Sequence, residues 1–385
     1  MSKNDFAPQE FAERRARVCQ AIGNAGLDWL LVIHPVSLHW LTGADTKSYT
    51  AFQCLPVSAR PGRLVMFTRA SERSEFEADT TVDEVRGWGG AEAEDPMEGF
   101  ARLVDELDLR RARVGMEVPA WYLHPHHYVR IKAMLGEALV ADPCTIVLDM
   151  KMVKSPREID YVRESARIVG EAVRALIAAV AEGRSELALA AAAYQTLLAS
   201  DSNLPASTIN LVTGERCHFV LGGPTSRRLR RGDPGYVEVG AAFRRYTSTL
   251  GRAWSLGEPS ARLREIHGAL CQAAEACIGE IRAGAPATAP HEALKRVLAE
   301  AGLEQYRQHT SGYGMAPGFP PSWGEPVNMI GGSKYVLRAG MVISVEPGVY
   351  LPRERLGMRL IDNVLVTPTG CEVLSTLPRD LAIVR

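Results

Sequence analysis

The sequence lacks the features that mark secreted, membrane-spanning and metal-thiolate proteins. Its seven cysteines are odd in number and include no Cys-x-x-Cys pair, which argues against a disulfide framework and against a thiolate zinc site. The first residues, MSKNDFAPQEFAERR, contain no apolar signal segment. No run approaches the roughly 18 apolar residues that a membrane helix needs. We therefore predict a cytoplasmic protein that does not enter a membrane.

An excess of charge of either sign is also missing. The 44 lysines and arginines are balanced by 45 aspartates and glutamates. No strong field would therefore steer the chain toward nucleic acid or an anionic membrane. We expect a small-molecule partner that is roughly neutral or zwitterionic. With 385 residues, of which 46% are hydrophobic, the chain is long enough for two domains.

The first part of the chain alternates between helical and strand-like stretches. Helical patterns occupy residues 11–26, 98–107 and 126–139, the last beginning at a histidine cluster (His124, His126, His127), and short apolar runs occupy residues 28–34, 63–68 and 113–118. Strands that alternate with helices in this way are typical of a sheet covered by helices. We predict an α/β domain over residues 1–150.

A second domain is predicted over residues 151–385. It opens on a helix with clear start signals, because Ser155 can cap the helix, Pro156 suits its first turn and Glu158 can complete a capping box. A second helix, a β-rich stretch and two further helices around residues 260–302 follow. The tail alternates apolar and polar residues as paired antiparallel strands do.

Four stretches of this second domain resemble the creatinase, prolidase and methionine aminopeptidase superfamily, and they come in that family's order. They are RRGDPGYVEVGAAFRRYTSTLGRAW, HTSGYGMAPGFPPSWGE, RAGMVISVEPGVY and GMRLIDNVLVTPTG. The stretches DWLLVIHPVSLHWLTG and KSPREIDYVRESARI are similar to two-domain members. The resemblance covers nearly the whole chain. It implies a creatinase-like N-terminal α/β domain followed by a "pita-bread" α+β catalytic domain.

The same resemblance locates the metal-ligand positions of the family. Its metallopeptidases hold a pair of divalent metals with two aspartates, one histidine and two glutamates. The corresponding residues here are Glu238, Thr249, Tyr313, Glu346 and Ile361. Two carboxylates, a hydroxyl, a phenol and an alkyl group are a poor set for two hard cations. We expect no metal, and we expect no other cofactor.

The family also contains metal-free hydrolases of small molecules, namely creatinase and ectoine hydrolase. The chain resembles ectoine hydrolases more closely, through Glu238, through Tyr313 in SGYGM and through Trp323 in PPSWGE. This implies a metal-independent hydrolase of a carbon–nitrogen bond in a small zwitterionic or cyclic amidine or amide compound. Whether Trp323 lines the pocket or only fills the core stays open.

One position departs from the metal-free pattern. Those relatives use a loop histidine as acid and base, and an ungapped comparison of TGERCHFVLGGPTSRRLRRGD places Leu221 on it, with His218 three residues earlier. Either the loop is rebuilt so that His218 enters the pocket, or this histidine is gone. Tyr313 would donate to the oxyanion that forms when water attacks a trigonal carbon.

The two surviving carboxylates are expected in one pocket. Without a cation between them, the charges of Glu238 and Glu346 repel, so one of them would hold a proton near neutral pH. Such a pair can clamp a cationic substrate nitrogen or transfer a proton. The alternative is a structural ion pair with Arg252 or Arg359. Thr249, Trp323 and Arg359 complete the substrate-contacting candidates.

Three other function classes stay open: an Xaa-Pro dipeptidase-like metallopeptidase, a lyase or cyclase that reuses the pocket in a biosynthetic pathway, and a catalytically silent binding protein. The resemblance also implies a homodimer in which each pocket is completed by the partner's N-terminal domain. The segment ADTKSYTAFQ, residues 44–53, is the candidate for that contribution.

Overall fold

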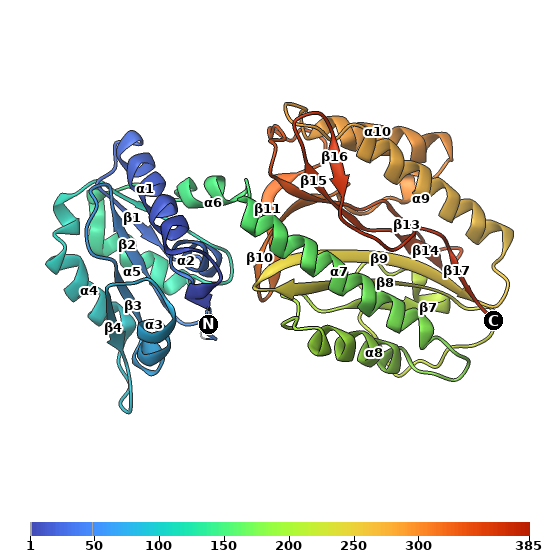
Figure 1. Cartoon of the computed structure of the whole chain (residues 1–385), viewed down its shortest axis with the longest axis horizontal. Helices are drawn as coiled ribbons and strands as arrows, with labels where there is room; N and C mark the ends of the chain where they lie inside the picture. The colour runs from blue at the N-terminus through green and yellow to red at the C-terminus, as the bar shows by residue number, and fades with distance from the viewer. Residues whose placement is uncertain (1, 48) are drawn as a thin grey trace. The chain divides into compact units, whose positions relative to one another are not determined.

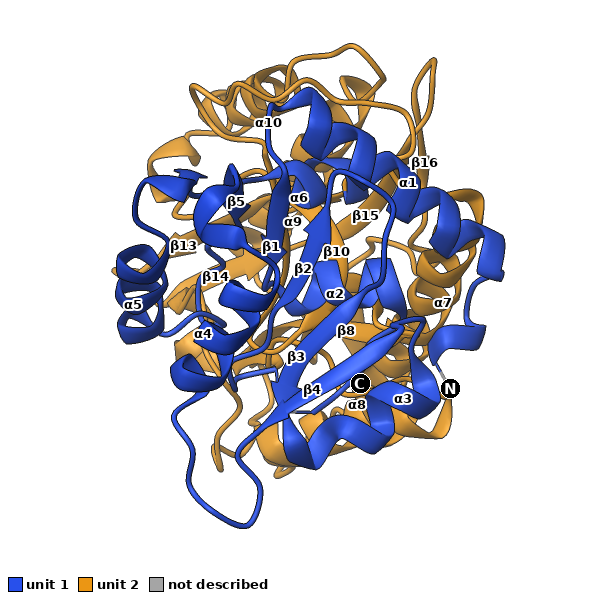
Figure 2. Ribbon diagram, turned by 90° about the vertical axis from the view of Figure 1, so that its left-hand side faces the viewer, with its two compact units in different colours: residues 1–151 blue, residues 152–385 orange. Residues whose placement is uncertain are grey.

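The computed structural model describes residues 2–47 and 49–385 and divides them into two compact units, Met1–Lys151 and Met152–Arg385 (Figure 2). Within the described residues, no helix is both long and apolar enough to cross a membrane.

The first unit is a small mixed sheet with helices around it. Its larger sheet has the strand order β2-β1-β5-β6, and β3 and β4 form a separate parallel pair. The elements, in chain order, are η1 Ser2–Asn4, α1 Pro8–Asn24, β1 Trp29–Val32, α2 Pro35–Thr42, β2 Leu55–Ser58, β3 Val65–Arg69, η2 Ala70–Glu72, α3 Arg73–Asp79, β4 Glu84–Trp88, α4 Pro96–Glu106, η3 Leu109–Arg111, β5 Val114–Met116, α5 Pro125–Leu135, η4 Gly136–Ala138, β6 Leu139–Ala141 and α6 Ile146–Lys151.

The strand at the centre of this unit has apolar side chains on both faces. Leu30 and Val32 pack into one buried cluster, while Leu31 and Ile33 pack into a second cluster on the other face. Successive side chains of a strand point to opposite faces, so a continuous apolar run is what a strand covered on both sides requires. The predicted α/β organisation of this part is confirmed.

The second unit contains the larger sheet, whose strands run in the order β16-β15-β12-β10-β9-β8-β7, with β11 on β10 and β17 on β9. A small β13-β14 sheet stands beside it. The elements are α7 Pro156–Ala178, α8 Glu186–Ala199, β7 Asn210–Thr213, η5 Gly214–His218, β8 Pro234–Phe243, β9 Tyr246–Leu256, α9 Ala261–Gly279, α10 Thr288–Glu300, η6 Glu304–Tyr306, β10 Tyr313–Phe319, β11 Ser322–Asn328, β12 Val342–Val345, β13 Gly348–Leu351, β14 Leu356–Arg359, β15 Asp362–Val366, β16 Cys371–Val373 and β17 Ala382–Val384.

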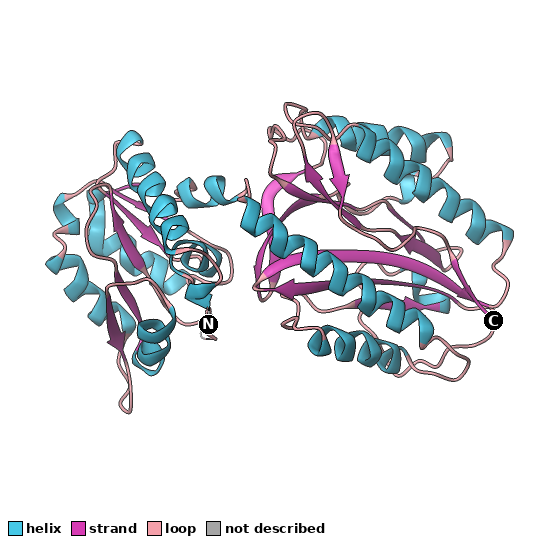
Figure 3. Cartoon of the chain, viewed as in Figure 1, coloured by secondary structure: helices cyan, strands magenta, loops and turns pink. Residues whose placement is uncertain are grey.

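The helices of this unit form two pairs, α7 with α8 and α9 with α10, and strands lie between them (Figures 1 and 3). Helix α7 begins as predicted: the Ser155 hydroxyl accepts from the backbone of Glu158, whose carboxylate accepts in return from the backbone of Ser155. The C-terminal stretches pair as antiparallel strands, β12 with β15 and β13 with β14, which confirms the alternation observed in the sequence.

The alternation of side chains along strand β8 determines on which face of the sheet Glu238 lies. Its residues Val237, Val239 and Ala241 pack into the apolar cluster of α7 and α8, and Tyr236 packs into the cluster of α9 and α10. Because side chains alternate along a strand, Glu238 shares the face of Tyr236 and points away from α7 and α8. The strand therefore presents one carboxylate on the face where β10, β11 and β14 supply the other polar groups.

Candidate active site

A small cavity opens on this face of the second unit. Its volume is about 160 Å³. Its walls are Ser207, Asn210, Leu221, Glu238, His309, Tyr313, Pro321, Ser322, Trp323 and Arg359. Of the predicted site residues, Glu238, Tyr313, Trp323 and Arg359 therefore meet in one cavity, and Trp323 lines its wall as well as being buried.

Arg359, at the end of β14, lies between the two surviving carboxylates. Its Nη1 donates to Oε2 of Glu238 at 2.6 Å, and its Nη2 donates to Oε2 of Glu346 at 2.5 Å. All three side chains are buried. The alternative left open by the sequence, an ion pair with Arg359, is present for both carboxylates, and the guanidinium supplies a counter-charge between them. Arg252, the other arginine considered, binds Asp362 instead.

Glu238 and Glu346 differ in their access to the cavity. Burial raises the pKa of Glu238, the Arg359 charge lowers it and the Glu346 charge raises it again. Oε2 of Glu238 also accepts from the amide of Asn210 at 2.9 Å, whereas no described residue donates to its Oε1. Glu346 stands behind Arg359 and is fully shielded from solvent. Glu238 is therefore the carboxylate with an oxygen available to a ligand.

His309 joins this cluster, although no motif in the sequence singled it out. Its Nδ1 lies 3.0 Å from Nη2 of Arg359 and 3.4 Å from Oε2 of Glu346. A guanidinium only donates, so Nδ1 must be the accepting nitrogen and Nε2 carries the hydrogen. Burial, followed by the Arg359 charge, lowers the pKa of His309. His309 therefore presents a neutral imidazole with an N–H at the cavity wall.

Tyr313 and Trp323 form a second polar pair. The indole Nε1 of Trp323 donates to the hydroxyl of Tyr313 at 3.0 Å. Burial, with the charges of Glu346 and Glu238, raises the pKa of Tyr313 well above its usual value of about 10. The phenol thus stays protonated, and its hydrogen is available because its oxygen already accepts.

Three of the predicted positions, Glu346, Thr249 and Ile361, are not among the residues of the cavity wall. Thr249 is buried in β9, where its backbone N–H donates to the side-chain oxygen of Asn363 at 2.6 Å and its hydroxyl accepts from the Asn363 amide at 3.2 Å. Ile361 is buried and pairs with Gly251 of β9. Glu325, the last residue of the PPSWGE stretch, forms a buried ion pair with Lys154.

The loop that carries Leu221 and His218 directs these two residues differently. Leu221 reaches the cavity wall and is 68% exposed. His218 is absent from the described cavity wall, and its Nδ1 donates to the carbonyl oxygen of Glu215 at 2.7 Å, within the same short helix. In this structure the ring of His218 is held in its own turn, and Leu221 is the residue of this loop that lines the cavity.

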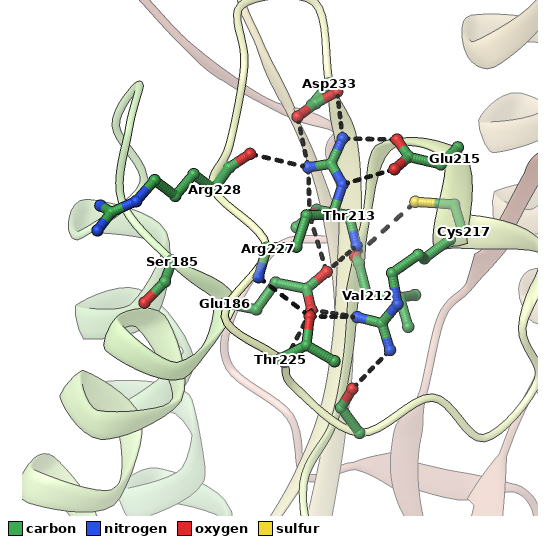
Figure 4. A network of polar contacts seen from close by, with 12 residues as sticks. Ser185, Glu186, Val212, Thr213, Glu215, Cys217, Thr225, Arg227, Arg228 and Asp233 are labelled. Carbon is green, nitrogen blue, oxygen red and sulfur yellow. Dashed lines mark hydrogen bonds and ion pairs between the residues drawn. The ribbon is translucent and has the colours of Figure 1, made fainter.

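A buried carboxylate fixes both ends of this loop (Figure 4). Glu186, in the first turn of α8, accepts at Oε1 from the backbone and hydroxyl of Thr213, and at Oε2 from the backbone and hydroxyl of Thr225. Arg216, inside the loop, pairs with the same carboxylate. A fully buried carboxylate needs several such donors. The side chain of Glu186 therefore holds together the two ends of the loop formed by residues 214–224.

The residues present do not fit a two-metal centre. Oxygen-rich ligand sets are what hard divalent cations require. Of the five family ligand positions only Glu238 and Glu346 carry carboxylates, and both bind Arg359. Among the residues that the structure describes, no group of three or more His, Cys, Asp or Glu side chains is arranged to hold a metal ion.

Comparisons with known proteins place this geometry in a family. Residues 14–153 match the creatinase/prolidase N-terminal domain, and residues 160–368 match metallopeptidase family M24. The Xaa-Pro dipeptidase of Pyrococcus horikoshii is 28% identical over 236 residues, which are 61% of this chain and 66% of that protein. The ectoine hydrolase of Halomonas elongata is 24% identical over 394 residues, 98% of each chain.

A solved structure agrees with these matches. Dipeptidase PepE from Mycobacterium ulcerans aligns with a TM-score of 0.84 at 26% identity, covering 98% of this chain and 99% of its own. The expected closeness to ectoine hydrolases needs correction, since both dipeptidases are more identical to this chain than the 24% of the ectoine hydrolase. A short shared motif is weaker evidence of a close relationship than identity over a whole alignment. The chain belongs to metallopeptidase family M24, a family of hydrolases, and consists of a creatinase/prolidase N-terminal domain followed by the family's pita-bread domain.

Proposed function

We propose that this protein is a metal-independent hydrolase that cleaves a carbon–nitrogen bond in a small zwitterionic or cyclic amidine or amide compound. The observation that carries the proposal is the guanidinium of Arg359 between Glu238 and Glu346. Those carboxylates stand at two of the positions where the family's metallopeptidases hold metals. In this chain the guanidinium of Arg359 supplies the positive charge between them.

The size of the cavity supports a small substrate. Pockets for drug-sized ligands span roughly 300–1,000 Å³, whereas this cavity holds about 160 Å³. Leu221, Pro321 and Trp323 supply apolar contacts, and Glu238, Tyr313 and Arg359 supply polar ones. Such a cavity suits a single small ring or a short amide.

The polar groups can be assigned complementary roles. Oε1 of Glu238 is the oxygen available to take a proton from water, since Oε2 already accepts from Arg359 and Asn210. The Tyr313 hydroxyl donates to the oxygen that becomes negative when water attacks the trigonal carbon, which is the electrostatic stabilisation that often dominates acyl transfer. Trp323 holds that hydroxyl in place.

Proton transfer at neutral pH needs a titratable group at the cavity wall whose pKa lies near neutrality. Burial raises the pKa of Glu238 toward neutrality, whereas burial lowers the pKa of His309 and keeps its imidazole neutral. We propose that Oε1 of Glu238 removes a proton from the attacking water and delivers it to the nitrogen as the carbon–nitrogen bond breaks, while the N–H of His309 donates a hydrogen bond to the leaving group. A role for His218 would require its loop to leave the arrangement held by Glu186.

The test is an assay of purified protein with and without a chelator. The panel contains ectoine, creatine, related cyclic amidines and an Xaa-Pro dipeptide. We expect turnover of a small amidine or amide that survives chelation, together with less than stoichiometric metal by elemental analysis. Tightly bound transition metal at about one equivalent or more, with activity lost in chelator, would contradict metal independence.

Peptide hydrolysis is the second candidate, because two of the matched relatives are named as dipeptidases. Hydrolysis of the Xaa-Pro dipeptide alone would establish it. No turnover of any compound, combined with binding of one of them, would favour a binding protein.

We also propose that the chain acts as a homodimer and that residues 44–53 take part in the partner's site. Residue 48 lies outside the described residues. Sedimentation analysis of the full chain and of a variant carrying Lys47→Ala and Tyr49→Ala measures the oligomeric state, and we expect a dimer in both. Steady-state kinetics should show a raised KM in the variant. A monomeric wild-type chain with full activity would contradict the proposal.

A further inference from the structure

The cavity wall of the second unit has an apolar part that takes no part in the proton transfers. Its apolar residues are Leu221, Pro321 and Trp323. Trp323 is buried, whereas Leu221 and Pro321 are exposed. Glu238 and Arg359, on the same wall, are buried. The cavity therefore has a buried polar end and an apolar end that meets solvent.

The backbone on both sides of Leu221 is fixed to the sheet. On one side, the carbonyl oxygen of Phe219 accepts a hydrogen bond from the hydroxyl of Tyr236, a buried residue of β8. On the other side, the carbonyl oxygen of Gly222 accepts from the backbone N–H of Leu211 in β7 at 2.8 Å. The middle of the loop of residues 214–224 is thus anchored, in addition to its two ends.

Close packing of the backbone holds the same loop against the strands. A Cβ atom at Gly222 would lie 2.2 Å from the side chain of Val212 in β7. A Cβ atom at Gly357 in β14 would lie 2.3 Å from the carbonyl oxygen of Cys217. Neither position has room for a side chain, so the loop lies directly on β7 and β14.

An exposed leucine on a fixed backbone is a preformed apolar contact for a ligand. Covering the Leu221 side chain removes apolar surface from water, which is favourable in proportion to the area covered. The loop has little backbone freedom left to lose when a ligand binds, because it is already ordered. A hydroxyl or a charge placed against Leu221 would lose its hydration and gain no hydrogen bond from that side chain.

We propose that Leu221 is a specificity-determining residue, which selects substrates that present an alkyl group or the methylene edge of a ring at the solvent end of the cavity. This inference rests on the proposed function and narrows its substrate class. The polar end of such a compound meets Tyr313 and Glu238, and its apolar end packs against Leu221 and Pro321. Compounds with a hydroxyl or a charge at the apolar end are disfavoured.

The experiment measures the binding of acetamide, propionamide and butyramide by ligand-detected NMR titration. In wild-type protein each added methylene that Leu221 covers should tighten binding by about fourfold. In Leu221→Ala the gain for each methylene should fall below about twofold, because part of the covering surface is gone. Leu221→Met should keep the wild-type gain, since methionine has a similar volume.

Leu198→Ala is the matched control. Leu198 is a leucine of α8 that is 57% exposed, and it is not among the residues that the structure places on the cavity wall. The variant removes the same atoms from the surface as Leu221→Ala. Its binding of the amide series should therefore equal that of wild type.

A second measurement requires no change of the protein. 3-Hydroxypropionamide carries a hydroxyl where butyramide carries its terminal methyl, and the two compounds are similar in size. Wild-type protein should bind the hydroxylated amide about tenfold more weakly. Leu221→Asn should reduce this preference, because a carboxamide can hydrogen-bond the hydroxyl.

A flat amide series in wild-type protein, equal gains in wild type and Leu221→Ala, or no binding of any amide overturns the inference. So does dissociation of a wild-type dimer by Leu221→Ala in sedimentation, because the side chain would then serve a subunit contact. Chelator-resistant hydrolysis of a panel compound with a flat amide series would contradict this inference and leave the proposed function intact. The expected amide series without hydrolysis of any compound would contradict the proposed function and keep Leu221 as the selective contact of a binding site.

Discussion

The indole nitrogen of Trp323 donates to the phenolic oxygen of Tyr313 at 3.0 Å, across a cavity wall that both residues line. This bond leaves the hydrogen of Tyr313 for a different acceptor. If that acceptor is the developing oxyanion, Tyr313→Phe should lower kcat by about 100-fold and change KM little, since only a transition-state contact is lost. Steady-state kinetics on the substrate found in the panel measure both.

The matched control is Tyr128→Phe, which removes a hydroxyl that donates to Asp142 at 2.5 Å in the first unit. Its kinetics should stay close to those of wild type. Equal losses in both variants, or a Tyr313→Phe protein with unchanged kcat, would remove Tyr313 from the chemistry.

A pair of histidine variants separates the two imidazoles. His309 lines the cavity, whereas the ring of His218 is held by a carbonyl of its own turn. We expect His309→Ala to lower turnover by about 100-fold, the scale of losing an acid–base or orienting group. His218→Ala should stay within about threefold of wild type, because it leaves the cavity wall untouched. The reverse pattern would mean that the loop of residues 214–224 rearranges when substrate binds.

Glu186 should control the cavity from a distance. Its carboxylate holds Thr213 and Thr225, the two ends of the loop that brings Leu221 to the cavity. Replacing a buried, multiply bonded carboxylate costs about 3–5 kcal/mol of unfolding free energy, so Glu186→Gln should lower Tm markedly. We also expect a raised KM and faster proteolysis between residues 214 and 224. The matched control is Glu164→Gln, a partly exposed helix carboxylate paired with Arg167, which should change none of these.

The first unit should lose stability in mild acid through His34. Burial, with a smaller effect of the Lys151 charge, lowers the pKa of His34 to about 3, whereas an unfolded chain titrates near 6.5. Between these pH values the unfolded state binds a proton that the folded state does not. Stability is therefore present above about pH 6.5 and falls as the pH is lowered, by at most about 1.4 kcal/mol per pH unit for one proton.

His34→Asn tests this prediction, because asparagine can replace the ring nitrogen that accepts from the backbone of Val36. Urea unfolding between pH 7 and pH 4 should show a shallower pH dependence in the variant than in wild type. The absolute stability of the variant does not test the assignment, because His34→Asn also removes a ring that packs on Tyr122 with centroids 5.0 Å apart. Parallel pH curves for the two proteins would refute the assignment.

Local signals made much of the fold predictable. The start of α7 follows from Ser155, Pro156 and Glu158, which all act within one helical turn. The face of β8 on which Glu238 lies likewise depends only on the period of a strand. Features of this kind depend on neighbours in the sequence, and sequence reasoning can reach them.

The cation between the carboxylates could not be predicted with the same certainty. Arg359 was considered both as a substrate contact and as an ion-pair partner, and nothing near it in the sequence decides between these roles. Its partner Glu238 is 121 positions away, and His309 is 50 positions away. Which side chain fills a buried space depends on rotamers and packing across strands. His309 was missed for the same reason, although it stands only four residues before Tyr313.

The distance of 121 positions between Glu238 and Arg359 also sets an order of events during synthesis. A ribosome releases the β8–β9 hairpin well before it reaches β14, so for that interval the glutamate has no guanidinium to meet. Burying it then would leave a lone charge in an apolar interior. We therefore expect the nascent pita-bread domain to keep this face hydrated until residue 359 has emerged. Fragments truncated before that point are consequently expected to hold the hairpin in a solvent-accessible, aggregation-prone state.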